Sequence, residues 1–314
     1  MKTVLLLVAA ATLAAQTPAP AGDVTGVGNF SHIVANLDRS VEFYRDVLGL
    51  ELAAQPRPFD PNPAIMRMGN TIGAQSRIAV LRVPGSAIGV ELIDYKDIDR
   101  QPAHPRFQDP GAGNLILRVA DLDGTVARLK KSGAHILTAG DVPATVRGTR
   151  VLFAQDPDGF VVELSQASAP GGGFEAAVEN IERTAAFYRL LGFEPSAPAA
   201  WNGDKLMTDT AGTPGAQFRQ SRAPIPGTSA TVTFIEFKDI DRKPLHTRIQ
   251  DPGTAILQLM VRDVDGLLAK LKAGGATVVS VGGEAVKIGT NARIAIVRDP
   301  NNLFLELIQR KTQP

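Results

Sequence analysis

Two glutamates stand inside aliphatic stretches of the sequence, Glu91 in IGVELI and Glu163 in FVVELS. An ionised carboxylate among such neighbours is costly unless it is paired or bound to a metal ion. Two carboxylates in one site would repel each other and raise one pKa, unless a cation lay between them. We therefore expect Glu91 and Glu163 either to hold a metal ion or to belong to a buried ion-pair network.

The segments that carry these glutamates occur twice along the chain. NFSHIVANLDRSVEFYRDVLGLEL at 29–52 matches GFEAAVENIERTAAFYRLLGFEP at 173–195, and RVLFAQDPDGFVVELSQ at 150–166 matches RIAIVRDPNNLFLELIQ at 293–309. The offset is nearly half the chain, which indicates a duplicated domain rather than a solenoid. ASAPGGG at 167–173 is the predicted linker, because it is rich in small residues, proline and glycine.

Each predicted domain divides again into two similar modules. Alternating apolar residues predict strands, and a 3.6-residue period between a capping residue and a glycine predicts a helix. In the first module we expect a strand at 30–36, a helix from Asp38 to Gly49, and strands at 77–83 and 88–94. In the second we expect a strand at 114–119, a helix capped by Asp121 or Asp123 and ended by Gly133, a strand at 135–138, and a hairpin of 150–155 and 160–166 around Asp156-Pro157-Asp158-Gly159. The unit is βαβββ, present four times, and the fold class is α+β.

This pattern resembles the vicinal oxygen chelate (VOC) superfamily, which includes glyoxalase I, extradiol dioxygenases and bleomycin-resistance proteins. The strongest signals are SHIVANLDRSVEFYRDVLGLEL and DPDGFVVEL, and the resemblance covers nearly all of the chain after residue 22. It implies two cupped, glyoxalase-like domains. The first would span 28–166, from modules 28–95 and 112–166, and the second would span 174–310. The pairing of modules stays open, because family members differ in it and modules from different halves could join instead.

The resemblance also implies a ligand set, because family ligands come from the first and last strands of each module. Carried over, these positions are His32, Glu91, Asn114 and Glu163 in the first cup. Nitrogen and oxygen donors of this kind suit Zn²⁺, Mn²⁺, Fe²⁺, Ni²⁺ or Co²⁺. Asn114 stands where many members have histidine, so the site would be open to water or substrate, or degenerate. A metal-free network in which His32 bridges the two glutamates is the alternative.

The second cup is expected to hold no metal. Its corresponding positions are Ala176, Thr233, Ile256 and Glu306, so one potential ligand remains. Glu306 is expected to pair with an arginine such as Arg293, or to reach the rim. The second domain would then serve as a packing partner, in place of the dimerisation of single-domain relatives.

KDIDRQPAHPRFQDPG at 96–111 and KDIDRKPLHTRIQDPG at 238–253 are near-copies that join successive modules. Because both cups keep them while one cup keeps the ligands, we expect their role to be architectural. His104 could alternatively reach a cup rim and bind substrate. Arg118 shares strand parity with Asn114, so it is a candidate for binding an anionic substrate. The segment 59–74 could cover the first cup or be an ordinary surface loop.

Composition limits the partners. The net charge of +1 gives no electrostatic footprint for nucleic acid or an anionic membrane.

Residues 1–22 combine Lys2, a short apolar run and small residues, which is typical of a cleaved secretory signal followed by a Pro/Ala tail, with an uncleaved membrane tether as the alternative. We expect a secreted or periplasmic monomer or homodimer that binds a small molecule. The sequence contains no cysteine, which excludes disulfides and thiolate ligands.

Two functions remain open. As an enzyme, the protein would be a divalent-metal-dependent lyase or isomerase, with Glu91 or Glu163 as the base and the metal stabilising an enediolate-like anion. As a binding protein, it would hold a small molecule without turnover, as bleomycin-resistance proteins do. An extradiol dioxygenase is less favoured, because the two-histidine, one-carboxylate ligand set of that group is not reproduced.

Overall fold

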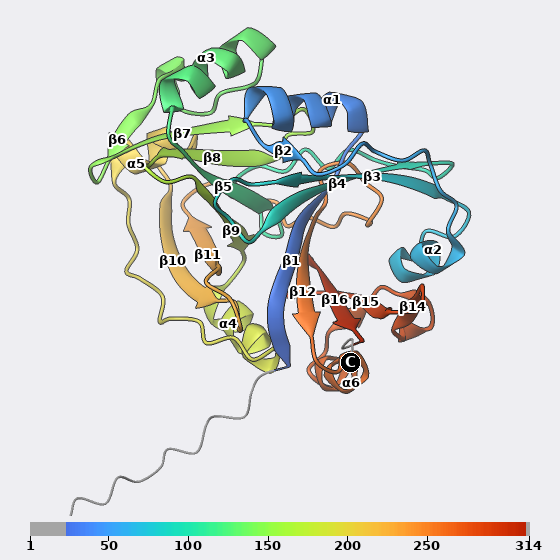
Figure 1. Cartoon of the computed structure of the whole chain (residues 1–314). Coiled ribbons are helices and arrows are strands. Elements are labelled where there is room, and N and C mark those ends of the chain that lie inside the picture. The colour runs from blue at the N-terminus through green and yellow to red at the C-terminus, as the bar shows by residue number, and fades with distance from the viewer. Residues whose placement is uncertain (1–22, 312–314) are drawn as a thin grey trace, which may run out of the picture.

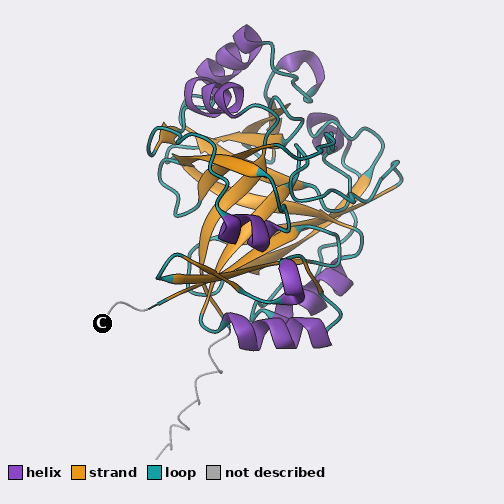
Figure 2. Cartoon of the chain, turned by 90° about the vertical axis from the view of Figure 1, so that its right-hand side faces the viewer, coloured by secondary structure: helices purple, strands orange, loops and turns teal. Residues whose placement is uncertain are grey.

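The computed structural model describes residues 23–311, so the predicted signal segment, residues 1–22, lies outside the described residues. Figure 1 shows two strongly curved sheets that meet along the middle of the molecule, and in Figure 2 helices lie at both ends of the strands. Among the described residues, no helix is both long and apolar enough to cross a membrane.

The four predicted modules are present. Module one contains β1 (Val24–Ile33), α1 (Leu37–Glu42), a π-helical turn (Phe43–Val47), β2 (Glu51–Leu52), α2 (Pro63–Gly69), β3 (Gln75–Arg82) and β4 (Gly89–Lys96). Module two contains β5 (Gly113–Val119), α3 (Leu122–Ser132), β6 (Ala144–Val146), β7 (Thr149–Gln155) and β8 (Val161–Gln166). The strand predicted at 135–138 is reduced to an isolated bridge at Ile136.

The second half follows the same order. Module three contains β9 (Gly171–Val178), α4 (Ile181–Leu190), α5 (Lys205–Thr210), β10 (Gln217–Pro224) and β11 (Thr231–Lys238). Module four contains β12 (Ala255–Val261), α6 (Val264–Ala273), β13 (Thr277–Val278), β14 (Val286–Ile288), β15 (Ala292–Arg298) and β16 (Phe304–Arg310). Short 3₁₀ turns at Ala139–Asp141 and Val281–Gly283 precede β6 and β14.

The modules pair differently from the expectation. Sheet A has the order β13-β15-β16-β12-β1-β4-β3-β2, with β14 beside β15, and sheet B has the order β10-β11-β9-β5-β8-β7-β6. Modules one and four therefore share sheet A, through β1 and β12, and modules two and three share sheet B, through β5 and β9. The prediction that modules one and two form one cup is wrong, because each crossover carries the chain from one sheet to the other.

The main helices of modules one and two lie together, as do those of modules three and four, although the strands of these module pairs belong to different sheets. In Figure 1, α1 and α3 lie together at the top and α4 and α6 at the bottom. Arg128 on α3 donates a hydrogen bond to the Val47 carbonyl at the end of the first helical segment. The caps follow the predicted chemistry in part: Asp121 caps α3 and Gly133 ends it with φ of 71°, but Asn36 rather than Asp38 caps α1.

The two crossover segments, 96–111 and 238–253, lie against each other and exchange equivalent contacts. The Ala103 N–H donates to the Pro252 carbonyl, and the Leu245 N–H donates to the Pro110 carbonyl, both at 2.8 Å. Such reciprocal bonds are the pattern of a two-fold interface, in which contacts occur in pairs. The crossovers therefore hold the two halves of the chain together, which is in keeping with the architectural role expected for them.

Buried aspartates anchor these crossovers. Asp109 accepts the Lys243 N–H at 2.8 Å, and Asp251 accepts the Gln101 N–H at 2.8 Å. Gly111 has φ of 94°, and a Cβ there would lie 2.4 Å from the Asn301 carbonyl oxygen, so only glycine fits this close approach.

Two short helices cover the concave faces. Met66 on α2 packs with Ile33, Ile93, Ile296 and Phe304 over sheet A. On sheet B, Met207 of α5 packs against the corresponding apolar cluster. The predicted cover at 59–74 therefore exists as α2, and it lies over the face of sheet A.

Candidate active site

The concave face of sheet B, hereafter the sheet B cup, contains a cavity of about 250 Å³. Glu163 on β8 and Glu175 on β9 enter it from the two strands that flank β5. Their side chains point to the same face. Ile116 on β5 pairs with Glu163 on one side and with Gly173 on the other. Glu175 lies two residues from Gly173, so the alternation of a strand places it on the same face as Glu163. The walls are largely aromatic and apolar, with Phe107, Phe153, Met207, Phe218 and Phe237.

The pKa values of the two carboxyl groups lie near neutral pH. Burial raises the pKa of Glu163 to about 7. Burial, and then the charge of Glu163, raise the pKa of Glu175 to about 8, although a hydrogen bond from Gln220 at 2.9 Å opposes this increase. Groups with pKa values near the working pH can both accept and release a proton, so this pair is suited to acid–base chemistry.

The concave face of sheet A, the sheet A cup, holds a second carboxyl pair. Gln258 Nε2 donates to Glu91 at 2.7 Å and to Glu306 at 3.3 Å, and Ser31 Oγ donates to Glu91 at 2.7 Å. Burial and the Glu91 charge raise the pKa of Glu306 to about 8, and burial raises that of Glu91. The expected partner of Glu306 is wrong, because Arg293 pairs with exposed Asp265 instead.

Replacing Glu306 by glutamine is expected to raise the free energy of unfolding relative to that of wild type, by an amount that grows as pH rises. Wild-type Glu306 keeps its proton up to about pH 8, whereas in the unfolded chain it ionises near 4.5. Wild type therefore loses stability between these values, while the neutral glutamine does not. Each pKa unit is worth about 1.4 kcal/mol, so the difference should reach roughly 2 kcal/mol or more by pH 8. Urea unfolding of both proteins at pH 5 and pH 8 measures it, and an equal difference at the two pH values would contradict the assignment.

His32 does not join the predicted ligand set. In the strand register Ser31, not His32, lies beside Glu91, so the imidazole points to the opposite face of sheet A. There it is fully buried, stacks near Phe160, and places Nε2 3.0 Å from Asp156. Burial alone would lower the pKa of His32, but the Asp156 carboxylate outweighs it and raises the pKa.

His32, Asp156 and Asp158 are the one histidine–carboxylate group among the described residues whose ligand atoms lie within 4.8 Å of one another. Asp156 is already occupied: besides His32 it accepts the Tyr44 hydroxyl and the N–H groups of Asp158 and Phe160. With these contacts in place, the group acts as a buried ion pair that joins the β7–β8 turn to β1.

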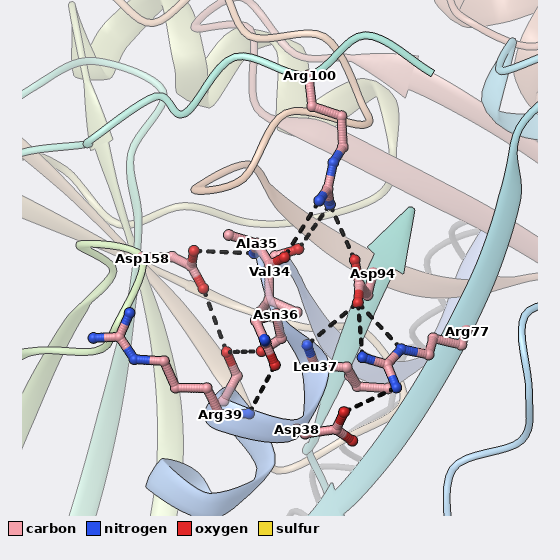
Figure 3. Close-up of polar contacts among 11 residues, drawn as sticks. Val34, Ala35, Asn36, Leu37, Asp38, Arg39, Arg77, Asp94, Arg100 and Asp158 are labelled. Carbon is pink, nitrogen blue, oxygen red and sulfur yellow. Dashed lines mark hydrogen bonds and ion pairs between the residues drawn. The ribbon is translucent and has the colours of Figure 1, made fainter. Parts of the chain in front are cut away.

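The same turn also holds the start of α1. Figure 3 shows Asp158 directed at the Ala35 N–H, at 3.0 Å, and Arg100 directed at the carbonyls of Val34 and Ala35. Arg100 also pairs with Asp94, which accepts the Leu37 N–H. The DPDG motif therefore docks module two against module one rather than contributing to a cup.

The remaining predicted residues fall in several places. Asn114 and Glu163 belong to sheet B, and Glu91 belongs to sheet A, so the four predicted ligands do not share one cup. Asn114 lies opposite Glu175 in the register of β5 and β9, and it is buried with no partner for its Nδ2 among the described residues. Arg118 is exposed and lines a different hollow beside Pro170. His104 is exposed, has φ of 46°, and lies outside both cups, in an outer hollow beside His135.

Glu175 was missed at the sequence level. It stands in GFEAAV, an acidic residue among apolar neighbours, which is the signal that identified Glu91 and Glu163. The expected cup position on that strand was Ala176, one residue away, and a shift of one residue reverses the face.

Three comparisons relate the chain to known proteins. A family model described as Glyoxalase/Bleomycin resistance protein/Dioxygenase superfamily matches residues 26–164 and 173–307. A 2-epi-5-epi-valiolone epimerase from Actinomyces sp. is 32% identical over 161 residues, which is 49% of this chain and 85% of that protein. A lactoylglutathione lyase from Haemophilus influenzae is 25% identical over 140 residues, covering 45% of this chain and 91% of the relative.

A solved structure shows the same fold over both halves. Glyoxalase I from Zea mays aligns with 91% of this chain and 92% of its own, with a TM-score of 0.62. The sequence identity is 18%, so this likeness establishes the fold alone.

Proposed function

Because the chain belongs to the glyoxalase/bleomycin resistance protein/dioxygenase superfamily, we propose that it is an isomerase or lyase with its active site in the sheet B cup. The observation that carries this proposal is the pair Glu163 and Glu175, two buried carboxyl groups with pKa values of about 7 and 8 in one cavity. Such a pair can move a proton on a small substrate near neutral pH.

The two carboxyl groups have different starting states at neutral pH. Glu163, with the lower pKa, is partly ionised and serves as the base that removes a proton from a carbon next to a carbonyl. Glu175, with the higher pKa, is mainly protonated and serves as the acid, held in place by Gln220. They reach the cavity from β8 and β9, so a proton taken from one side of the substrate can return from another. Removal of the proton from one face and its return to the other inverts the configuration of that carbon, which is the reaction of an epimerase.

A divalent ion, which the family resemblance implies, fits the oxygen donors of this cup. Glu163 and Glu175 would hold it, with Asn114 beside them, since the amide of Asn114 has a buried Nδ2 without a partner and its oxygen and nitrogen positions can exchange. An all-oxygen set favours a hard cation such as Mg²⁺ or Mn²⁺ over Zn²⁺. When bound, it would keep both carboxyl groups ionised and polarise the substrate carbonyl, so the acid and base roles given above belong to the cup without the ion.

The relatives support this class of reaction. One is named as an epimerase and another as a lyase, and the epimerase matches this chain at 32% identity. We do not transfer the substrates of these relatives to this chain. What we propose that it shares with them is proton transfer next to a carbonyl group.

Binding without turnover is the second candidate. The sheet B cavity has phenylalanine walls and no histidine among its described lining residues, which suits simple retention of a small apolar molecule. In that case the two glutamates would donate hydrogen bonds in their protonated form, and no proton would leave the ligand.

Deuterium exchange separates the two candidates. The protein is incubated in D₂O with small hydroxy ketones, and NMR follows loss of the proton beside the carbonyl, with Mn²⁺ in one arm and EDTA in the other. In the EDTA arm the rate is expected to rise as pH passes about 7 and to fall above about 8, as the base ionises and then the acid loses its proton. Binding of a ketone without exchange in either arm would favour the binding protein.

A further inference from the structure

Arg222 on β10 is the one cation among the described residues that line the sheet B cavity. It lies opposite Thr233 in the register of β10 and β11, so both side chains share the face that carries Gln220. Within the described residues its guanidinium has no salt bridge or hydrogen bond. Arg219, on the other face of the same strand, pairs with Glu182 and Glu236. Arg222 is therefore available to a ligand.

Arg222 and the carboxyl pair reach one cavity from different strands. In the strand register Arg222 lies opposite Thr233, and Thr233 lies beside Glu175. Two strand spacings, about 10 Å, therefore separate the backbone positions of Arg222 and Glu175.

Much of the remaining lining is apolar. Phe153, Phe218 and Phe237 line the cavity together with Ile235 and Met207. At about 250 Å³, the cavity is smaller than the pockets that hold drug-sized ligands. A matching ligand carries a carboxylate close to its reacting carbon, together with a small apolar side chain that packs on the phenylalanines.

We propose that the sheet B cup takes a small hydroxy or oxo carboxylate with an apolar side chain, and that Arg222 determines this specificity by binding the carboxylate. The planar guanidinium matches a carboxylate with two parallel hydrogen bonds. The inference rests on the proposed function, because the reacting carbon would then lie beside Glu163 and Glu175. The carboxylate would bind Arg222, and the carbon next to it would face Glu175 and Glu163.

Phenyllactate and phenyllactamide test the proposal, since they differ only in the charge of one group. Calorimetric titration should show phenyllactate binding to wild type, and Arg222→Gln should weaken it by about 10-fold or more, the value of a charge-assisted hydrogen bond. Phenyllactamide should bind both proteins equally. Arg118→Gln is the matched control, because that exposed arginine lies outside the cavity, and it should leave phenyllactate binding unchanged.

Three results would overturn the inference: equal affinity of wild type for the acid and the amide, no binding of the acid up to ~10 mM, or equal effects of the two arginine variants. Failure of the proposed function is recognised separately. If wild type exchanges no proton but Arg222→Gln still weakens phenyllactate binding, the carboxylate site stands without catalysis. If exchange occurs and Arg222→Gln changes nothing, catalysis stands and the carboxylate specificity fails.

Discussion

Replacing Glu163 by glutamine is expected to slow proton exchange by about a hundred-fold to ten-thousand-fold, the contribution of a positioned general base. Glutamine keeps the size of the side chain and removes its capacity to take a proton. Glu175→Gln should cause a comparable loss and should also remove the fall in rate above about pH 8, since that fall reports deprotonation of Glu175.

Glu306→Gln is the matched control for both variants. Glu306 is also buried, also lies beside a second carboxyl group, and has a pKa raised to about 8, but it belongs to the sheet A cup. Its replacement should leave exchange unchanged. A loss of exchange in Glu306→Gln, with activity retained in Glu163→Gln, would move the active site to the sheet A cup.

Replacing Asp251 by alanine is expected to lower the free energy of unfolding by about 2 to 4 kcal/mol, because a buried, charge-assisted hydrogen-bond network loses its acceptor. Asp251 accepts the N–H groups of Gln101 and Arg248 and pairs with the Arg248 guanidinium at 2.8 Å. Urea unfolding near neutral pH measures the loss. Asp109→Ala, which removes the equivalent residue of the other crossover, should behave similarly.

Asp99→Ala provides the control, because Asp99 pairs with the same guanidinium but its side chain is 73% exposed. An exposed ion pair contributes at most about 1 kcal/mol. The hydrogen bonds from Arg248 and Gln101 outweigh burial and lower the pKa of Asp251, so its contribution is present above the unfolded value of 3.8 and is lost as pH falls through the folded value. Equal losses in the Asp99 and Asp251 variants would contradict the role assigned to the crossovers.

The modules could be predicted from the sequence because their signals are local. The internal repeat, the alternation of apolar residues and caps such as Asp121 and Gly133 each depend on a few neighbouring residues. The α+β class and the glyoxalase-like fold are confirmed. The short helices α2 and α5 were not predicted as helices, because six or seven residues give too little periodicity.

The pairing of modules could not be predicted in the same way. Alternation identifies the buried face of a strand, but it does not say which other strand lies along its edge. β1 and β5 occupy equivalent positions, and either could have met the other or a strand of the second half. The choice depends on contacts between the crossovers, where residues far apart in sequence, such as Asp251 and Gln101, meet.

The error at His32 has a similar origin. Both His32 and Ser31 lie on a strand, and only the register with β4 shows that Ser31 faces Glu91. The family resemblance pointed to the histidine, because family ligands come from the first strand of each module. The structure instead pairs His32 with Asp156, and this buried pair links two parts of the chain.

The exchange of modules between sheets affects how the protein reaches its native state. β1 finds its neighbour β12 only after more than two hundred further residues, and sheet A also needs β16, which ends at Arg310. Contacts between residues so far apart in sequence form slowly, because the intervening chain must lose entropy before the contacts can offset that loss. β1, the first of the described strands, is therefore among the last to be completed, and until then its open edge depends on protection from other chains.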